Sequence, residues 1–186
     1  MSNAFGMAIG MVEYKTVSKG LLVADIMLKT AHVEIIEAQT VCPGKYILIL
    51  KGELSAINAC IEVARTSYSE HLIDSFILGN PHESIFPAIY GTTNIEKVNA
   101  LGILETFSVP SIIVAADEAA KTAQVNLIEI RIARGMCGKS YLLLTGDVAS
   151  VTAAIDKAKE AASDSGWLLD SSVIASPDGQ LCKSIL

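Results

Sequence analysis

The sequence predicts an α+β fold made of two tandem, unpermuted copies of one βαββαβ module, a ferredoxin-like arrangement with helices packed on one face of each sheet. An internal repeat is the first observation, because residues 8–39 align with residues 100–131 at an offset of 92. The match then resumes at Gly44-Lys45 against Gly138-Lys139, after a two-residue insertion. Strand-like and helix-like apolar patterns also follow the same order in both copies.

The start of the first copy combines an apolar strand with a capped helix. The segment AIGMVEY predicts a strand over residues 8–14. A helix over 18–31 follows, and either Thr16 or Ser18 is suited to cap its first turn.

A hairpin comes next in the order. Strands are predicted over residues 33–41 and 45–51, joined by a Cys-Pro-Gly turn. Pro43 restricts one backbone angle and Gly44 tolerates unusual ones, which is what a chain reversal needs.

The second half of the module supplies the remaining helix and strand. A helix is predicted after Gly52, and a fourth strand over 72–78 ends near Asn80-Pro81, where a short helix can follow. In the second copy the equivalent long helix shows apolar residues at spacings of three and four, which predicts one buried stripe. The stripe consists of Val148, Val151, Ile155, Ala158 and Ala162.

The repeat sets the predicted domain boundaries. We expect a first domain over residues 5–90 and a second over 99–186, with YGTTNIEKVN as the linker between them. Hydrophobic residues make up 51% of the chain and charged residues only 18%. A large apolar area must therefore be buried inside the modules or between subunits, which predicts oligomerisation.

Charge and motif content exclude several functions. The net charge of −6 disfavours nucleic-acid and anionic-membrane surfaces, which need clustered Lys and Arg. No apolar run reaches the length of a membrane span, so we expect a soluble cytosolic protein. No catalytic triad, carboxylate pair, zinc-protease motif or phosphate-binding loop appears, so we expect no enzyme activity. Glu13 and Glu105, repeated at a strand end, are interpreted as structural.

The four cysteines lie far apart along the chain. They never form Cys-x-x-Cys, which excludes an ordinary zinc or iron-sulfur site within one chain. Cys60 and Cys182 are interpreted as buried or neutral thiols.

The repeated motifs resemble those of bacterial microcompartment shell domains. The resemblance rests on AIGMVE, ADIMLKTAHV, PGKYILILKGE and AINACIEVA in the first copy and on ALGILE, ADEAAKTAQV and GKSYLLLTGD in the second. It covers nearly the whole chain and is nearest to the T-type tandem shell proteins of propanediol-utilisation compartments, through CPGK. It implies a homotrimer that mimics a hexamer, tiles with other shell proteins around an enzyme core in the cytoplasm, and places the turn between the second and third strands at a central pore.

This resemblance implies a role for the isolated Cys42. A three-fold axis gathers one thiol from each chain, and the T-type family holds a 4Fe-4S cluster in this way, so we expect Cys42 to be its sole protein ligand. The cluster is shared by three subunits and can be absent from protein prepared in air. Backbone amides of Gly44 and its neighbours are expected to donate to sulfur. The alternative is that Cys42 is a small thiol tolerated in a pore turn.

The second copy carries a different turn, IARGMCGKSY. Arg134 stands opposite Cys42 when the copies are aligned from the preceding strand, whereas Met136 or Cys137 does so when they are aligned from Gly138. The charge of Arg134 would favour an anionic cluster. Cys137 is considered as an auxiliary thiol, but six sulfurs exceed what one cubane accepts. The predicted pore turns are therefore Pro43, Gly44 and Lys45 with Arg134, Gly135, Met136, Cys137 and Gly138.

Two lysines match the edge lysine of the family. Lys29 and Lys121 recur at equivalent positions, and the resemblance implies contacts between neighbouring tiles. The family often carries an arginine before the proline that ends the fourth strand, but Asn80 and Ser176 stand here. A solvated lysine near a helix end is the alternative reading.

The leading prediction is a shell tile whose pore cluster passes electrons, or the cluster itself, between cytosol and lumen and meets a redox partner. One alternative keeps the tile but leaves the pore empty for small polar metabolites. The other, from a different class, is a cytosolic trimeric ligand sensor built on the same units.

Overall fold

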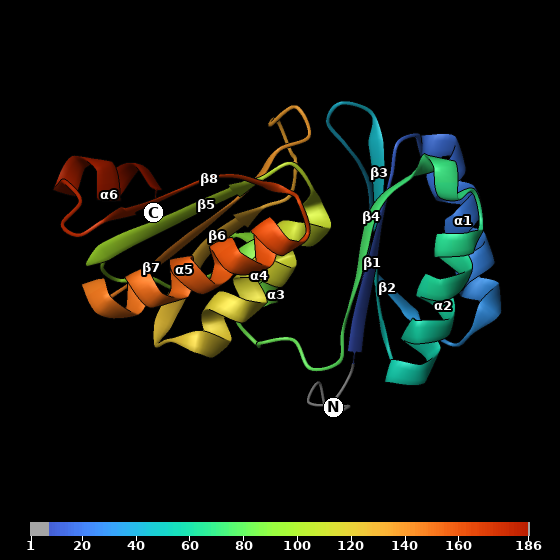
Figure 1. Ribbon diagram of the computed structural model, residues 1–186, viewed down its shortest axis with the longest axis horizontal. Coiled ribbons are helices and arrows are strands. Elements are labelled where there is room, and N and C mark those ends of the chain that lie inside the picture. Colours follow the sequence, from blue (N-terminus) through green and yellow to red (C-terminus); the bar gives the residue numbers. More distant parts are fainter. Residues whose placement is uncertain (1–7, 186) are drawn as a thin grey trace. The chain divides into compact units, whose positions relative to one another are not determined.

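The structure, a computed structural model, describes residues 8–185 and divides into two compact units (Figure 1). The first unit runs to Pro81 and also includes Ala133–Gly138, while the second contains His82–Ile132 and the chain from Lys139 onward. The predicted outer domain limits, residues 5 and 186, lie outside the described residues. No helix in the described part of the chain is both long and apolar enough to cross a membrane.

The first unit is built on a four-stranded antiparallel sheet with the order β2-β3-β1-β4. The apolar sequence of these segments explains why they form strands, and β1 is buried along its whole length. The strands are β1 (Ala8–Tyr14), β2 (Glu34–Val41), β3 (Lys45–Gly52) and β4 (Leu72–Leu78).

Two helices of the first unit pack against each other beside this sheet (Figure 1). They are α1 (Val17–Thr30) and α2 (Leu54–Thr66), and a short 3-10 turn, η1 (Ser69–His71), leads into β4. Thr16 occupies the cap position of α1, but its side chain makes no capping hydrogen bond. Ser18, the other predicted cap, lies inside the helix.

Close approach between the helices and the sheet requires small residues at two points. A Cβ atom at Gly10 would lie 2.7 Å from Ile57 Cγ2, and one at Gly20 would lie 2.5 Å from Tyr46 Cβ. Glycine is therefore the residue that lets α1 rest on the Tyr46 ring. Around these contacts lies an apolar core that includes Met27, which is fully buried.

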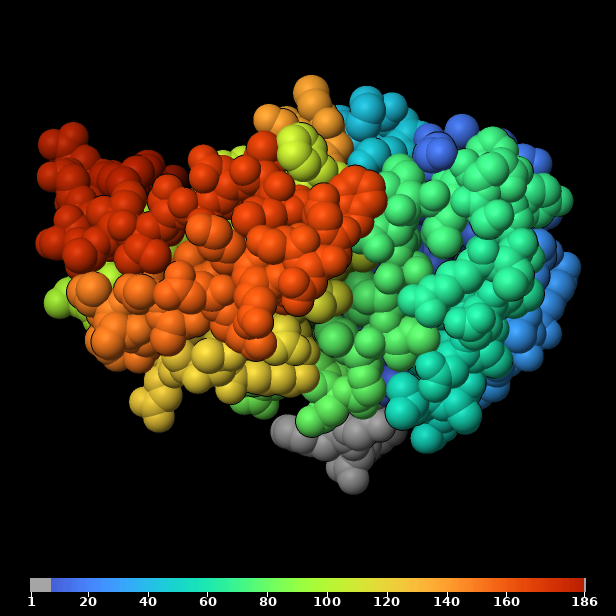
Figure 2. Space-filling view, in the orientation of Figure 1, coloured from blue at the N-terminus to red at the C-terminus, as the bar shows by residue number. Residues whose placement is uncertain are grey.

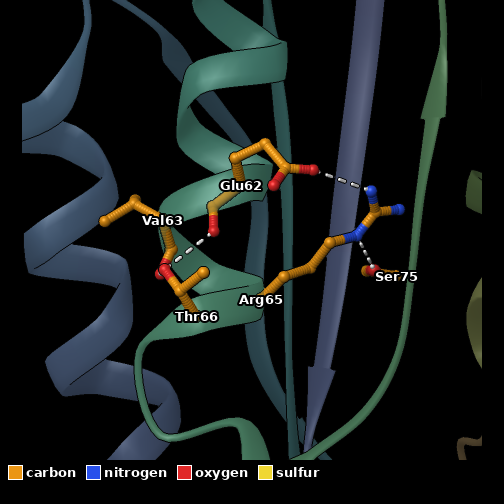
Figure 3. A network of polar contacts seen from close by, with 5 residues as sticks. All are labelled: Glu62, Val63, Arg65, Thr66 and Ser75. Atoms are coloured by element: carbon orange, nitrogen blue, oxygen red, sulfur yellow. Dashed lines mark hydrogen bonds and ion pairs between the residues drawn. The ribbon is translucent and has the colours of Figure 1, made fainter.

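The end of α2 is also held to the sheet by polar contacts (Figure 3). Arg65 Nε donates to Ser75 Oγ on β4 at 3.0 Å, and Arg65 Nη1 lies 3.2 Å from Glu62 Oε1. Thr66 Oγ1 donates to carbonyls of the preceding turn, those of Glu62 and Val63. These exposed contacts orient the helix end and add little stability.

The second unit repeats the same sheet in the order β6-β7-β5-β8. Its strands are β5 (Ala100–Thr106), β6 (Val125–Arg131), β7 (Ser140–Gly146) and β8 (Leu168–Ile174), and its helices are α3 (Ile85–Tyr90), α4 (Val109–Thr122), α5 (Val148–Asp164) and α6 (Gly179–Ile185). Both edge strands carry a register shift at the same aligned place, between Ile35 and Glu37 in β2 and between Leu127 and Glu129 in β6. The predicted α+β fold with two βαββαβ modules is confirmed.

One detail of the predicted buried stripe is wrong. Val151, Ile155, Ala158 and Ala162 are buried as expected, together with Ala154. Val148, however, is 47% exposed. It is the first residue of α5, and periodicity shows which side of a helix is apolar but not whether the end of the helix is covered.

Candidate functional site

The predicted pore turn of the first module lies at one end of its sheet, between β2 and β3. The Gly44 N–H donates to the Val41 carbonyl oxygen at 2.9 Å, which closes the reversal. Gly44 has a φ of 95°, a region that favours glycine, and a Cβ there would meet no atom within 4 Å. The Cys42–Pro43 bond is cis, and the Cys42 side chain is exposed. Cys42 is therefore a free thiol presented at the tip of a tight turn.

Backbone amides of Gly44 and its neighbours were expected to donate to sulfur, and for Gly44 the structure shows a different use. That N–H group already serves the Val41 carbonyl, because closing a turn of this length needs it. The amide is used inside the chain and does not point to a sulfur ligand.

The predicted pore turn of the second module belongs to the first compact unit. This turn has positive φ at Ala133, Gly135, Cys137 and Gly138. A Cβ atom at Gly138 would lie 3.2 Å from Lys45 Nζ and 3.3 Å from Pro43 Cδ. The structure thus brings the two turns side by side, and Gly138 is the residue that permits the approach.

Lys45 is turned inward, away from the open side of its turn. Its Nζ lies 3.0 Å from Glu13 Oε1, and the Glu13 side chain is 0% exposed while that of Lys45 is 17% exposed. A fully buried carboxylate needs such a partner, since a lone buried charge is costly. Lys45 therefore neutralises the end of β1, and the repeated strand-end glutamate has a structural role in this module.

Arg134 also has a carboxylate nearby. Its Nη2 lies 3.8 Å from Glu37 Oε2, and about half of the Arg134 side chain is exposed. Sequence reasoning had singled out Arg134 but missed Glu37. The repeat contained a signal for this residue, because Glu37 aligns with Glu129. In the second module, Glu129 accepts a hydrogen bond from Tyr141 Oη at 2.6 Å.

The remaining cysteines divide by exposure. Cys137 is exposed like Cys42, whereas Cys60 is fully buried and its Sγ donates to the Met27 carbonyl at 3.2 Å. Burial raises the pKa of the Cys60 thiol. Cys182 is partly buried and packs against the outer face of the second sheet. Within residues 8–185, no three or more His, Cys, Asp or Glu side chains gather as metal ligands in one chain.

The exposed cysteines of one chain supply only part of the ligands that an iron-sulfur cluster needs. An exposed thiol at a turn tip is the donor type that iron-sulfur clusters use. One chain offers Cys42 and, on the adjacent turn, Cys137, so any complete set of ligands must come from several chains.

The two predicted edge lysines differ in their surroundings. Lys29 Nζ lies 2.6 Å from Asp25 Oδ2, and both side chains are more than half exposed. Lys121 Nζ lies 2.5 Å from Asp117 Oδ2, but Asp117 is only 1% exposed. Its other oxygen, Oδ1, accepts the His82 N–H at 2.7 Å. Asp117 thus also holds the backbone just before α3, a contact that the repeat did not predict.

Comparison with known proteins identifies the family to which this chain belongs. The model of the BMC domain matches residues 8–81 and again residues 100–177. The chain is 38% identical to the bacterial microcompartment shell protein PduT of Citrobacter freundii, over 96% of this chain and 97% of that protein. It is 29% identical to the carboxysome assembly protein CcmO of Synechococcus elongatus, over 96% of this chain and 68% of CcmO.

Solved structures agree with this assignment. A microcompartment protein from Desulfitobacterium hafniense superposes with a TM-score of 0.83 and 45% identity, covering 96% of this chain and 99% of that one. A fused permuted hexameric shell protein from the RMM microcompartment shares the fold, with a TM-score of 0.64, 22% identity and coverage of 85% and 82%. The chain belongs to the bacterial microcompartment shell proteins, as a structural shell protein with two BMC domains in tandem.

Proposed function

We propose that three copies of this chain form a pseudohexagonal tile of the shell and that the three Cys42 thiols surround its central pore, where they hold a 4Fe-4S cluster. When bound, such a cluster supplies one-electron transfer. The tile would then carry electrons, or the cluster itself, across the shell to a redox partner.

The observation that carries this proposal is the placement of Cys42. Its thiol is exposed at the tip of the β2–β3 turn, and the chain has one such thiol on that turn. A three-fold axis past the tip would make three equivalent donors from one residue, leaving the fourth iron to a non-cysteine ligand. The resemblance to T-type shell proteins implies the same use of this position.

The charges around the turn decide how the site would be tuned. Lys45 is paired with Glu13, so Arg134, whose side chain is about half exposed on the adjacent turn, is the cation that we expect a negatively charged cluster to attract. Its pairing with Glu37 at 3.8 Å is long enough to exchange for a stronger partner.

A pore without a cluster is the second candidate. The Gly44 amide is used inside its turn and offers sulfur no hydrogen bond, and this is the observation that supports the second candidate. The tile would then conduct small polar metabolites. A trimeric ligand sensor outside any shell is the third candidate.

Iron analysis of anaerobically purified trimers separates the first two candidates. We expect about four irons and four sulfides per three chains, with broad visible absorbance that dithionite bleaches. Cys42→Ser should lose this absorbance while remaining trimeric.

The matched control is Cys137→Ser, which removes the other exposed thiol of the neighbouring turn and should retain the iron. A wild-type trimer that stays colourless after reconstitution with iron and sulfide would leave the open pore as the better account.

Electron microscopy of overexpressed protein separates a tile from a sensor. Sheets or tubes are expected for the wild type, and Lys29→Asp should abolish them while leaving discrete trimers, since Lys29 is 74% exposed and its replacement should not disturb the fold. Lys121→Gln avoids placing a second carboxylate beside the buried Asp117 and tests the other edge. Wild-type trimers that never associate would favour the sensor.

A further inference from the structure

Two exposed thiols lie on neighbouring turns of the first compact unit. Cys42 lies on the turn between β2 and β3, and Cys137 lies on the turn between β6 and β7. Both are exposed, whereas the other two cysteines of the chain are buried wholly or in part. The proposed cluster uses only Cys42, so the second exposed thiol has no role in it.

The two turns touch one residue away from each thiol. A Cβ atom at Gly138 would lie 3.3 Å from Pro43 Cδ and 3.2 Å from Lys45 Nζ. Pro43 directly follows Cys42 in the chain. Gly138 directly follows Cys137, so the two thiols flank the contact from opposite turns. Figure 2 shows the first turn, in light blue, and the second, in orange, meeting at the surface.

Both turns have open space beside their tips. A Cβ atom at Gly44 or at Gly135 would meet no atom within 4 Å. The tips can therefore shift without displacing packed side chains. A disulfide needs Cα atoms about 4–7 Å apart, a separation that residues next to a contact between two turns can adopt.

We propose that Cys42 and Cys137 of one chain form a reversible disulfide. Exposed disulfides are typically the labile and regulatory kind, because small thiols reach and reduce them. The bond itself does not depend on a cluster. Its consequence rests on the proposed function: bond and cluster exclude each other, since each uses the Cys42 sulfur.

The step needs an oxidant, and a small disulfide such as oxidised glutathione supplies it. One chain thiolate attacks a sulfur of the small disulfide, which forms a mixed disulfide and releases one small thiolate. The other chain thiolate then attacks the chain sulfur of the mixed disulfide and releases the second small thiolate. Two protons pass from the chain thiols to the released thiolates. The chain loses two electrons, and the small disulfide gains them.

Peptide mapping of the iron-free protein tests the bond directly. Full-length chain is equilibrated with oxidised glutathione, alkylated, and digested with trypsin without reduction. We expect residues 30–45 linked to residues 135–139, and an intact mass lower by two hydrogen atoms. Alkylated Cys42 and Cys137, or a mixed disulfide that persists on either of them, would overturn the inference.

Isotope labelling decides whether the bond lies within one chain. 14N- and 15N-labelled chains are mixed and reassembled before oxidation. The linked peptides should both carry the same isotope. Linked peptides that carry different isotopes would place the bond between chains and overturn the inference.

Gly138→Ala tests whether the contact between the turns makes the bond possible. The added methyl group would lie 3.3 Å from Pro43 Cδ and hold the turns apart, so disulfide formation should slow by about fivefold or more. Gly135→Ala is the matched control, because it also has a positive φ but would meet no atom of the other turn, and its rate should stay near that of the wild type. Equal slowing in both variants would contradict this account. Circular dichroism checks that both variants are folded.

Oxidation of the iron-loaded protein separates this inference from the proposed function. Anaerobic trimers that hold the cluster should form the linked peptides at least about tenfold more slowly than iron-free trimers, because Cys42 is occupied. Equal rates would overturn the mutual exclusion of bond and cluster. A wild type that yields the linked peptides but never binds iron would remove the cluster and support the disulfide, whereas an iron-binding wild type without linked peptides would do the reverse.

Discussion

The two modules share strand order, register and even the position of the edge-strand bulge, yet they fill equivalent positions differently. In the first module Gly20 lies against the ring of Tyr46. The aligned positions of the second hold Ile112 and Ser140, both 0% exposed. A glycine with a large aromatic residue has become a large aliphatic residue with a serine. Topology therefore survives duplication when side-chain volume is exchanged between positions that occupy the same part of the fold.

The ends of the first strands differ in charge as well. Glu13 is fully buried and paired with Lys45, whereas Glu105 is half-buried, and within residues 8–185 no ion pair joins it to the aligned Lys139. The same two residue types thus form a buried pair in one copy and separate, half-buried groups in the other. Stability should depend on this carboxylate much more strongly in the first module.

The largest expected effect comes from breaking that pair. Lys45→Met should lower the free energy of unfolding by about 3 kcal/mol, because it leaves the buried Glu13 charge without this ammonium. Lys139→Met, the matched change in the second module, should cost less than about 0.5 kcal/mol. Urea unfolding at one protein concentration measures both, and equal losses would contradict the comparison.

A methyl group at Gly20 tests the volume exchange. Gly20→Ala should cost about 2 kcal/mol although alanine is the better helix former, because the added carbon would lie 2.5 Å from Tyr46. Gly79→Ala, where the nearest atom would be at 3.7 Å, is the control and should change stability by less than about 0.5 kcal/mol. Thermal unfolding of both variants measures the two costs, and equal costs would contradict the steric account.

The buried side chain of Tyr14 should make the stability of the first module fall at high pH. Tyr14 Oη donates to the Ala64 carbonyl at 2.6 Å, and burial, with a smaller contribution from Glu70, raises the pKa of Tyr14 to about 12. The folded chain keeps this proton where the unfolded chain, with its ordinary value near 10.0, loses it. The stabilisation is complete below that ordinary value and is lost as the pH rises through the folded one.

Tyr14→Phe should therefore cost about 1.5 kcal/mol at neutral pH and flatten the fall in stability above pH 10. Tyr141→Phe is the comparison in the second module, because burial also raises the pKa of Tyr141 to about 12. Chemical unfolding at a series of alkaline pH values measures the slopes. An unchanged slope in Tyr14→Phe would show that other groups cause the loss.

The smallest difference concerns the helix caps. Ser108 accepts the Ser111 N–H at 3.0 Å at the start of α4, whereas the aligned Thr16 makes no capping bond and its buried hydroxyl has no hydrogen-bond partner within the described chain. Ser108→Ala should cost about 1 kcal/mol. Thr16→Val should be neutral or slightly stabilising, since it removes an unpaired polar group. Matched melting curves would show whether the caps differ in this way.

Much of the fold is accessible from local patterns. The repeat, the order of strands and helices and the Cys-Pro-Gly reversal all follow from periodicity and turn chemistry, which depend on near neighbours in the chain. The repeat alone does not place the two turns together, because equal positions in two modules can lie far apart; only the resemblance to shell proteins implied that they meet. Two contacts did not follow from local patterns, since each joins segments far apart in sequence. They are the ion pair of Arg134 with Glu37 and the hydrogen bond from His82 to Asp117.

Equivalent surfaces that differ in burial between the two modules show most clearly what local patterns cannot predict. Leu21 and Ile113 have the same place in the same helical pattern, but one is 54% exposed and the other 0% exposed. Periodicity reports which side of a helix is apolar, whereas exposure depends on what else reaches that side. From the sequence we inferred a duplicated α+β shell protein with a cysteine on each of two equivalent turns. Which copies of the repeated residues are paired, covered or left open depends on long-range contacts, and local patterns do not encode these contacts.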